Sequence, residues 1–209
     1  LSSLFSSALS NTFETKDITL IMTCTLDLEE AIHSFADLID DMLHNSINCG
    51  GDSPQAINST SRTQQFSEFA RIQTSPSLSE AEKDKLMKDP RPTRIRKFVS
   101  CYLDMSSGTT ETLLQAYIIL VKFLRRTRWV LQATNWRILV LLSLILAQRL
   151  QEEATLSPRR MHELYPIYSV KDYTSLQKSF LELLGYDDFR TSKNDYLSAL
   201  ATLEKFSQQ

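Results

Sequence analysis

The sequence predicts an all-α fold in which several helices surround one buried central helix. The stretch from Ile138 to Ala147 is apolar on every side, interrupted only by Ser143, and such a helix must be enclosed by protein or by lipid. It is too short for a membrane span, which needs about 20 apolar residues. The 209 residues include four Gly and six Pro, with none between Thr109 and Ser157, which favours helices over strands and tight turns.

The composition, with 42% hydrophobic and 23% charged residues and a formal net charge of −2, is that of an ordinary globular protein. Cys24, Cys49 and Cys101 form no CxxC pair, which suits a reducing compartment and predicts an intracellular protein, cytoplasmic or nuclear. The chain begins with Leu1 rather than Met, so membrane tethering through a preceding lipid anchor stays open.

Residues 1–92 are predicted to form an extension ahead of the main domain. An acidic helix over about 27–45 would begin at Asp27, whose side chain can cap it. The polar stretch over about 46–78 is predicted to be a linker. A short helix over about 79–88 follows, because Ser79 and Glu82 have the spacing of a capping box.

Residues 93–209 are predicted to form one helical domain. Thr134 is the expected cap of the central helix, Ser157 and Ser169 are expected to cap the two helices after it, and Gly185 should end the second of these. Ser107-Gly108 should separate the first two helices. The helices expected around the central one cover about 93–105, 110–126, 157–165 and 169–184, with one extra C-terminal helix at about 194–206.

Several pieces of this domain together resemble the cyclin box. The central helix ends in residues 147–152 (AQRLQE), which fit the family pattern A-x-[KR]-hydrophobic-x-[ED]. Residues 111–124 are similar to the preceding box helix with its internal small residue, and residues 176–184 are similar to the helix that faces the kinase. The resemblance covers residues 93–206 and is nearest to the cyclin Y branch, related to the yeast phosphate-pathway cyclins. Its supporting pieces are residues 134–140, 180–184 and 194–196.

This resemblance implies a five-helix cyclin box around its buried third helix, and with it a function. A cyclin is a regulatory subunit that binds and activates a cyclin-dependent protein serine/threonine kinase. It packs on the αC helix of the kinase and holds the kinase's Lys–Glu ion pair in place, which permits phosphoryl transfer. The cyclin itself performs no chemistry, so the resemblance predicts a protein that is not an enzyme and needs no cofactor.

The resemblance also implies a set of kinase-binding residues. Arg149 stands at the basic position that ends the third helix, and Gln177 stands where the family has Glu on the fifth. Gln can accept a hydrogen bond but lacks the charge assistance of a carboxylate, so Gln177→Glu should tighten kinase binding. Lys97 and Val121 replace the usual Arg–Asp pair between the first two helices. The remaining expected contacts are Leu150, Glu152, Leu181 and Leu184.

A cyclin-box adaptor that binds a protein or transcription partner without activating a kinase is the main alternative. An exposed apolar surface of Leu150, Leu181 and Leu184 around Arg149 would favour the kinase regulator, because such surfaces form binding hot spots. On the simplest interpretation, Arg149 and Glu152 would instead belong to a surface ion-pair cluster of small energetic weight. A helical enzyme is a third possibility, but no Gly-rich phosphate loop or GxSxG motif supports it.

Two further motifs suggest other partners. Arg125, Arg126 and Arg128 lie beside Trp129, but cations at a helix C-terminus are usually solvated, so no nucleic-acid partner is expected. These arginines could instead dock the acidic helix at about 27–45. Residues 71–76 (RIQTSP) place Thr74 in an R-x-x-[ST]-x-P pattern that a phosphopeptide-binding protein could recognise after phosphorylation.

Metal binding is not predicted. The histidines lie far from the cysteines and from one another in sequence. Two of them fall on one face of the acidic helix without an evident third ligand. They are His33, His44 and His162.

Overall fold

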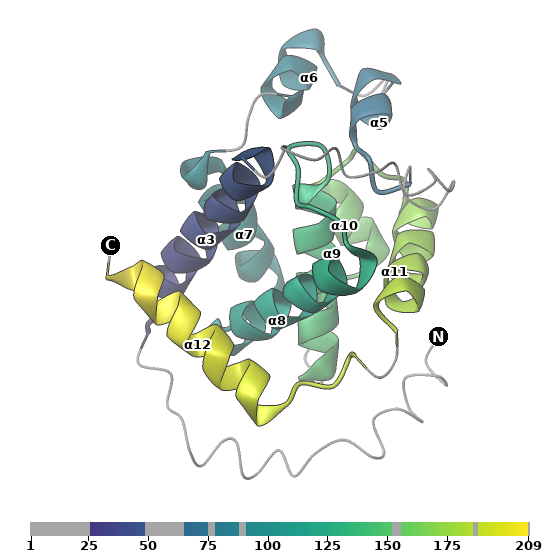
Figure 1. The fold of residues 1–209 in the computed structure, drawn as a ribbon. Helices are drawn as coiled ribbons and strands as arrows, with labels where there is room; N and C mark the ends of the chain where they lie inside the picture. The colour runs from purple at the N-terminus through teal and green to yellow at the C-terminus, as the bar shows by residue number, and fades with distance from the viewer. Residues whose placement is uncertain are drawn as a thin grey trace.

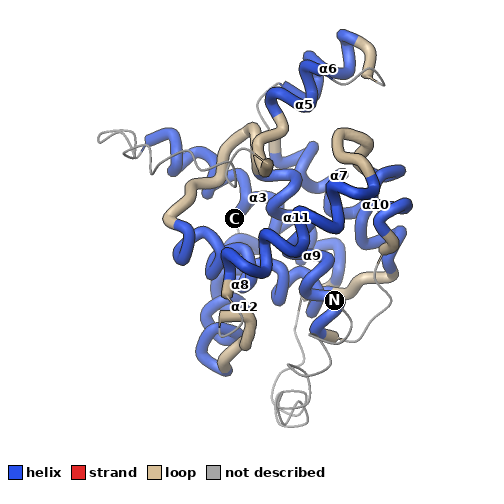
Figure 2. The backbone as a smooth tube through the Cα atoms, turned by 90° about the vertical axis from the view of Figure 1, so that its right-hand side faces the viewer, coloured by secondary structure: helices blue, strands red, loops and turns tan. Residues whose placement is uncertain are grey.

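A computed structural model shows an all-helical fold in the part of the chain that it describes, as the sequence predicts (Figures 1 and 2). The residues that the structure describes are 26–48, 65–74, 78–87, 91–151, 156–185 and 188–208. Within those ranges no residue is in a strand, and no helix is both long and apolar enough to cross a membrane.

The helices coincide closely with the predicted ones, with one addition. Helix α5 falls inside residues 46–78, where the sequence predicted only a linker, so that prediction misses an ordered segment. The helix bounds are α3 (Leu28–Asn48), α5 (Phe69–Thr74), α6 (Glu80–Met87), α7 (Pro92–Ser106), α8 (Thr110–Thr127), α9 (Trp136–Leu150), α10 (Pro158–Leu164), α11 (Val170–Leu184) and α12 (Lys193–Ser207).

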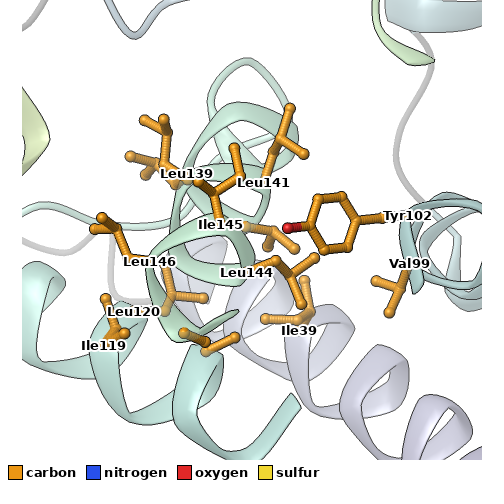
Figure 3. Packing of buried hydrophobic residues seen from close by; sticks show 14 of the residues in the cluster. Ile39, Val99, Tyr102, Ile119, Leu120, Leu139, Leu141, Leu144, Ile145 and Leu146 are labelled. Atoms are coloured by element: carbon orange, nitrogen blue, oxygen red, sulfur yellow. The ribbon is translucent and has the colours of Figure 1, made fainter. Parts of the chain in front are cut away.

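Helix α9 is the buried central helix, which confirms the prediction made from its apolar run. Every residue from Trp136 to Gln148 is buried. Figure 3 shows five of its apolar side chains among those of three neighbouring helices. The labelled residues on α9 are Leu139, Leu141, Leu144, Ile145 and Leu146, and those around them are Ile39 of α3, Val99 and Tyr102 of α7, and Ile119 and Leu120 of α8.

Helix α3 shares this core, because it packs against α7, α8 and α12. Its Phe35 and Ile39 are fully buried, and Asp37 accepts a hydrogen bond from Arg96 of α7 at 2.8 Å. The acidic helix therefore docks on the domain through Arg96. Arg126, one of the arginines considered for this docking, is paired instead with Asp188.

Helix α9 begins without the cap that the sequence predicts. Its N-cap residue is Asn135, not Thr134, and the Asn135 side chain makes no capping bond. It accepts instead from the Gln132 amide at 2.8 Å. The caps predicted at Asp27, Ser157 and Ser169 are present, and Gly185 ends α11. The first turn of the central helix therefore needs an acceptor from elsewhere in the chain.

Some predictions fall on residues that the structure does not describe. Glu152 and the polar stretch 52–64 lie outside the described ranges, as do Cys24 and Cys49. Thr74 ends α5, but its side chain is not described. Figures 1 and 2 both show α5 and α6 projecting from one end of the helical bundle.

Candidate functional site

Among the predicted contact residues that the structure describes, the two that reach the surface lie at the C-terminal end of α9. Arg149 and Leu150 are half-buried, whereas Gln148 before them is fully buried. The Tyr102 hydroxyl of α7 donates to Gln148 Oε1 at 2.6 Å, and Gln148 Nε2 donates to the Ser106 carbonyl at 3.2 Å. These bonds fix the end of α9 against the end of α7, so Arg149 leaves the core from a rigid base.

The turn between α7 and α8 completes this end of the molecule. A Cβ atom at Gly108 would lie 2.5 Å from Leu103 Cδ2 and 3.3 Å from Gln148 Nε2, so a larger residue there would have to displace these side chains. On the other side of the turn, Thr112 Oγ1 donates to Gln151 Oε1 at 3.1 Å. The start of α8 is thus tied to the residue that follows α9.

Burial affects the charge at this end of α9. It lowers the pKa of the Arg149 guanidinium, because a cation loses water there, and the nearby Tyr102 acts in the opposite direction. An arginine stays protonated at neutral pH despite such a shift. The Arg149 cation has therefore already lost part of its water in the free protein. Less desolvation is needed on binding, which favours charge-assisted hydrogen bonds to a partner's carbonyl groups.

The predicted contact residues on α11 face the core instead of the surface. Gln177 is 2% exposed, and its Nε2 donates to Met161 Sδ of α10 at 3.6 Å. Leu181 and Leu184 lie four and seven positions further on, on the same side of the helix, and both are buried. The exposed apolar surface considered around Arg149 is therefore not formed by these two leucines.

A second cluster of polar groups, not found in the sequence, surrounds the N-terminal end of α9. Glu68 is fully buried although it lies in a polar stretch. Its Oε1 accepts from the backbone N–H of Ile138 at 3.0 Å, and its Oε2 accepts from Arg137 Nη1 at 3.1 Å. The Glu68 amide donates to the Thr134 carbonyl at 2.8 Å. Glu68 thus supplies the acceptor that Asn135 does not provide.

The electrostatics of this cluster are dominated by burial. Burial raises the pKa of Glu68 to about 7, although Arg137, Tyr165 and the Ile138 amide all favour the ionised carboxylate. Burial, with the Glu68 charge as a second cause, also raises the pKa of Tyr165 and Tyr168. The positive end of the α9 dipole stabilises an anion at this place. The cluster is therefore built around one carboxylate whose charge is costly to keep.

Only a weak signal in the sequence could have pointed to this cluster. Phe66, Phe69 and Ile72 are large apolar residues near Glu68 in a mainly polar stretch, and the structure buries Phe66 and Ile72. Aromatic residues in a polar segment suggest anchoring, but periodicity does not identify the partner. The pairing of Glu68 with Arg137 spans 69 positions and follows only from the tertiary structure.

The arginine cluster at the end of α8 is exposed to solvent, and within it Arg126 pairs with Asp188. Arg125 and Arg128 are exposed, while Trp129 packs edge-on against Phe66 and Phe123, with ring centroids 5.6 and 5.5 Å away. The indole therefore packs against buried aromatic side chains and is not interleaved with the exposed arginines. Among the residues that the structure describes, no group of three or more His, Cys, Asp or Glu side chains could hold a metal ion.

No family model matches the chain, and no curated protein matches its sequence. The assignment of a function therefore depends on two places in the fold. One is the C-terminal end of α9, where Arg149 and Leu150 reach the surface. The other is the Glu68 cluster at its N-terminal end.

Proposed function

We propose that this protein is a cyclin-like regulatory subunit that binds and activates a cyclin-dependent protein kinase. The observation that carries the proposal is the end of α9. This helix is buried by its neighbours over its apolar length, and it ends in Arg149 and Leu150, which are half-exposed. Arg149 is the residue that corresponds to the basic kinase contact in the resemblance to the cyclin box over residues 93–206.

The rigid base of Arg149 supports this role. The Tyr102–Gln148–Ser106 hydrogen bonds fix the end of α9, from which the Arg149 side chain extends, before a partner arrives. Arg presents a planar fork of donors, which suits backbone carbonyls at the end of a kinase helix. Leu150 beside it adds apolar area at the same contact.

The burial of the α11 residues favours a second candidate function. Gln177, Leu181 and Leu184 are in the core, so the proposed kinase contact consists of the end of α9 without these side chains. A smaller contact of this kind suits a cyclin-box adaptor, which binds a protein partner and does not reorganise a kinase. The two candidates differ in whether the bound partner gains phosphoryl-transfer activity.

Charge reversal at Arg149 tests the proposal. We expect Arg149→Glu to abolish copurification of the kinase, because the variant places a carboxylate against backbone carbonyls, while helicity and melting temperature stay unchanged. Arg159→Glu is the matched control, because Arg159 is 87% exposed on α10 and its ion pair with Glu163 is long at 3.7 Å. Unaltered copurification by Arg149→Glu would contradict the assignment. A captured partner without kinase activity would favour the adaptor.

A further inference from the structure

Residues 65–74, which include α5, contact α11 and the start of α9 at one end of the bundle, and we call this segment the strap. Among its described side chains, Phe66, Glu68 and Ile72 are buried, with exposures of 1%, 0% and 2%. The surface beneath it, which we call the strap surface, comes from α8, the loop between α8 and α9, the start of α9, the loop between α10 and α11, and α11. The strap surface includes Phe123, Trp129, Arg137, Tyr168, Asp172 and Ser179.

Two contacts at its ends give the direction of the strap. Gln65 accepts a hydrogen bond from Ser179 of α11 at 3.4 Å, and Arg71 donates to Asp172 of α11 at 2.9 Å. Asp172 and Ser179 are two turns apart and therefore lie on the same side of the helix. The strap runs antiparallel to α11 and follows it for about 10 Å.

The side chains of the strap are recognised one by one. The Phe66 ring meets Phe123 and Trp129 edge-on, at centroid distances of 6.2 and 5.6 Å. Glu68 pairs with Arg137 at 3.1 Å and accepts from the first turn of α9. An aromatic side chain and a carboxylate thus occupy separate places on the strap surface, as in a bound peptide.

The basic residue of the strap has its own place as well. The Arg71 guanidinium lies over the Tyr168 ring, 4.7 Å from its centroid, in addition to its pair with Asp172. Burial alone would raise the pKa of Asp172, but hydrogen bonds from Ser169 and Arg71 outweigh it and lower that pKa. Asp172 is therefore a stable anionic partner for a basic side chain.

These contacts are specific, but some of the polar groups that form the interface lack hydrogen-bond partners. Within the described part of the chain, Gln65 Nε2 and Tyr168 OH are buried without a hydrogen-bond partner, and both have lost their bonds to water. A buried ion pair such as Glu68–Arg137 adds little net stability, because both ions are desolvated. The strap surface is therefore specific for the strap, but the net free energy that holds the strap in place is small.

The connection to α3 also allows the strap to leave. Residues 49–64 join the end of α3 to the strap, and a chain of that length can span about 50 Å when extended. Release of residues 65–74 therefore needs no displacement of α3 from the core.

We propose that the strap is an exchangeable internal ligand, and that the strap surface binds in its place a partner peptide with the same chemistry. Such a peptide carries an aromatic residue two positions before a glutamate and a basic residue three positions after it, as Phe66, Glu68 and Arg71 do. Arg137 selects the carboxylate and Asp172 selects the base. This proposal concerns the N-terminal end of α9, whereas the proposed kinase contact is at its C-terminal end. It therefore does not depend on a kinase partner.

Binding of the strap sequence in trans tests the proposal. A fluorescein-labelled peptide of residues 64–75 (QQFSEFARIQTS) is titrated into the full chain and into its Phe66→Ala variant, with anisotropy as the readout. We expect the variant to bind at least about tenfold more tightly than the wild type, because its own strap no longer competes effectively. The matched control peptide carries Glu68→Lys and should bind at least about tenfold more weakly. A folded variant that binds neither peptide, or both equally, overturns the proposal.

Hydrogen exchange of the unmodified chain provides a test that does not depend on a folded variant. The Ile138 amide is protected by Glu68, and the Glu68 amide by Thr134, so both exchange whenever the strap leaves. We expect them to exchange at least about tenfold faster than amides in the middle of α9, such as that of Leu144. Equal rates would mean that the strap leaves only on global unfolding, which overturns the proposal.

Discussion

Glu68 caps the central helix by accepting a hydrogen bond at 3.0 Å from the backbone N–H of Ile138, 70 positions away. A helix normally receives this acceptor from its own N-cap residue, but Asn135 is bonded to the Gln132 amide. The same carboxylate neutralises Arg137. One side chain from the N-terminal part of the chain therefore completes both the hydrogen bonding and the charge balance at the start of α9.

Removal of this carboxylate should destabilise the fold strongly. Glu68→Ala removes the carboxylate that pairs with Arg137, which is 5% exposed, and the acceptor that caps α9. We expect the free energy of unfolding to fall by about 3–5 kcal/mol in mildly alkaline buffer, because one member of a buried ion pair is lost while the other stays buried. Urea denaturation followed by far-UV circular dichroism measures the change.

Glu163→Ala is the matched control for that experiment. Glu163 is exposed and pairs with Arg159 across one turn of α10 at 3.7 Å. Its loss should change the free energy of unfolding by less than about 0.5 kcal/mol. The capping role of Glu68 would be refuted by a loss below about 1 kcal/mol in Glu68→Ala.

The stability of the chain should carry a pH dependence that comes from Glu68. Its folded pKa of about 7 lies above the ordinary value of 4.5, so the folded chain holds this proton more strongly than the unfolded chain. The stabilisation linked to the proton is complete below pH 4.5 and is lost as the pH rises through about 7. The groups that face the carboxyl are Arg137, Tyr165, Tyr168 and the Ile138 amide.

Glu68→Gln isolates this effect, because an amide does not titrate. We expect the free energy of unfolding of the wild type, relative to that variant, to decrease by at most about 1.4 kcal/mol per pH unit across this range. Denaturation curves of both proteins at several pH values provide the comparison. A difference that grows with rising pH would show that Arg137 outweighs burial and would refute the expected direction of the pKa shift.

The turn at Gly108 should not accept a side chain. In Gly108→Ala, the new Cβ would lie 2.5 Å from Leu103 Cδ2 and push against the amide of Gln148. We expect a loss of about 1–3 kcal/mol in the free energy of unfolding. Ser107→Gly, at the neighbouring position with φ 54°, should stay within about 1 kcal/mol of the wild type. Equal stability of Gly108→Ala and wild type would show that the turn can shift.

The structure reverses the expectation for Gln177→Glu. The resemblance to the cyclin box predicts tighter kinase binding, but Gln177 is buried against Met161, so the variant would bury a carboxylate beside a thioether. We expect the free energy of unfolding to fall by about 1–3 kcal/mol without a gain in kinase capture. Gln177→Met is the control and should lose less, since it keeps the volume and removes the polar group. Tighter capture at unchanged stability would restore the original prediction.

Most of the fold could be predicted from the sequence because its signals are local. The apolar run in α9, the caps at Ser157 and Ser169 and the stop at Gly185 each depend on neighbouring residues alone. Helix α5 was missed for the same reason. It has six residues, and a helix that short is stabilised by tertiary contacts and not by propensity.

The candidate site was harder to predict, because exposure depends on packing between elements. Arg149 and Leu150 reach the surface, as the resemblance implies, but the burial of Leu181 and Leu184 follows from how α11 is rotated against its neighbours. A sequence gives the apolar face of a helix and not its width. Glu68 was missed because no sequence pattern links a carboxylate to an arginine 69 positions later.

The long-range cap has a consequence for the way the chain reaches its final state. During synthesis, Glu68 emerges well before α9 and can pair only after Arg137 has followed. Contacts so distant in sequence close slowly, because a long loop must first be ordered. A fragment that begins at residue 93 would retain the resemblance to the cyclin box but would lack the acceptor for Ile138 and the partner of Arg137. Such a fragment should therefore be less stable than a chain that includes the strap.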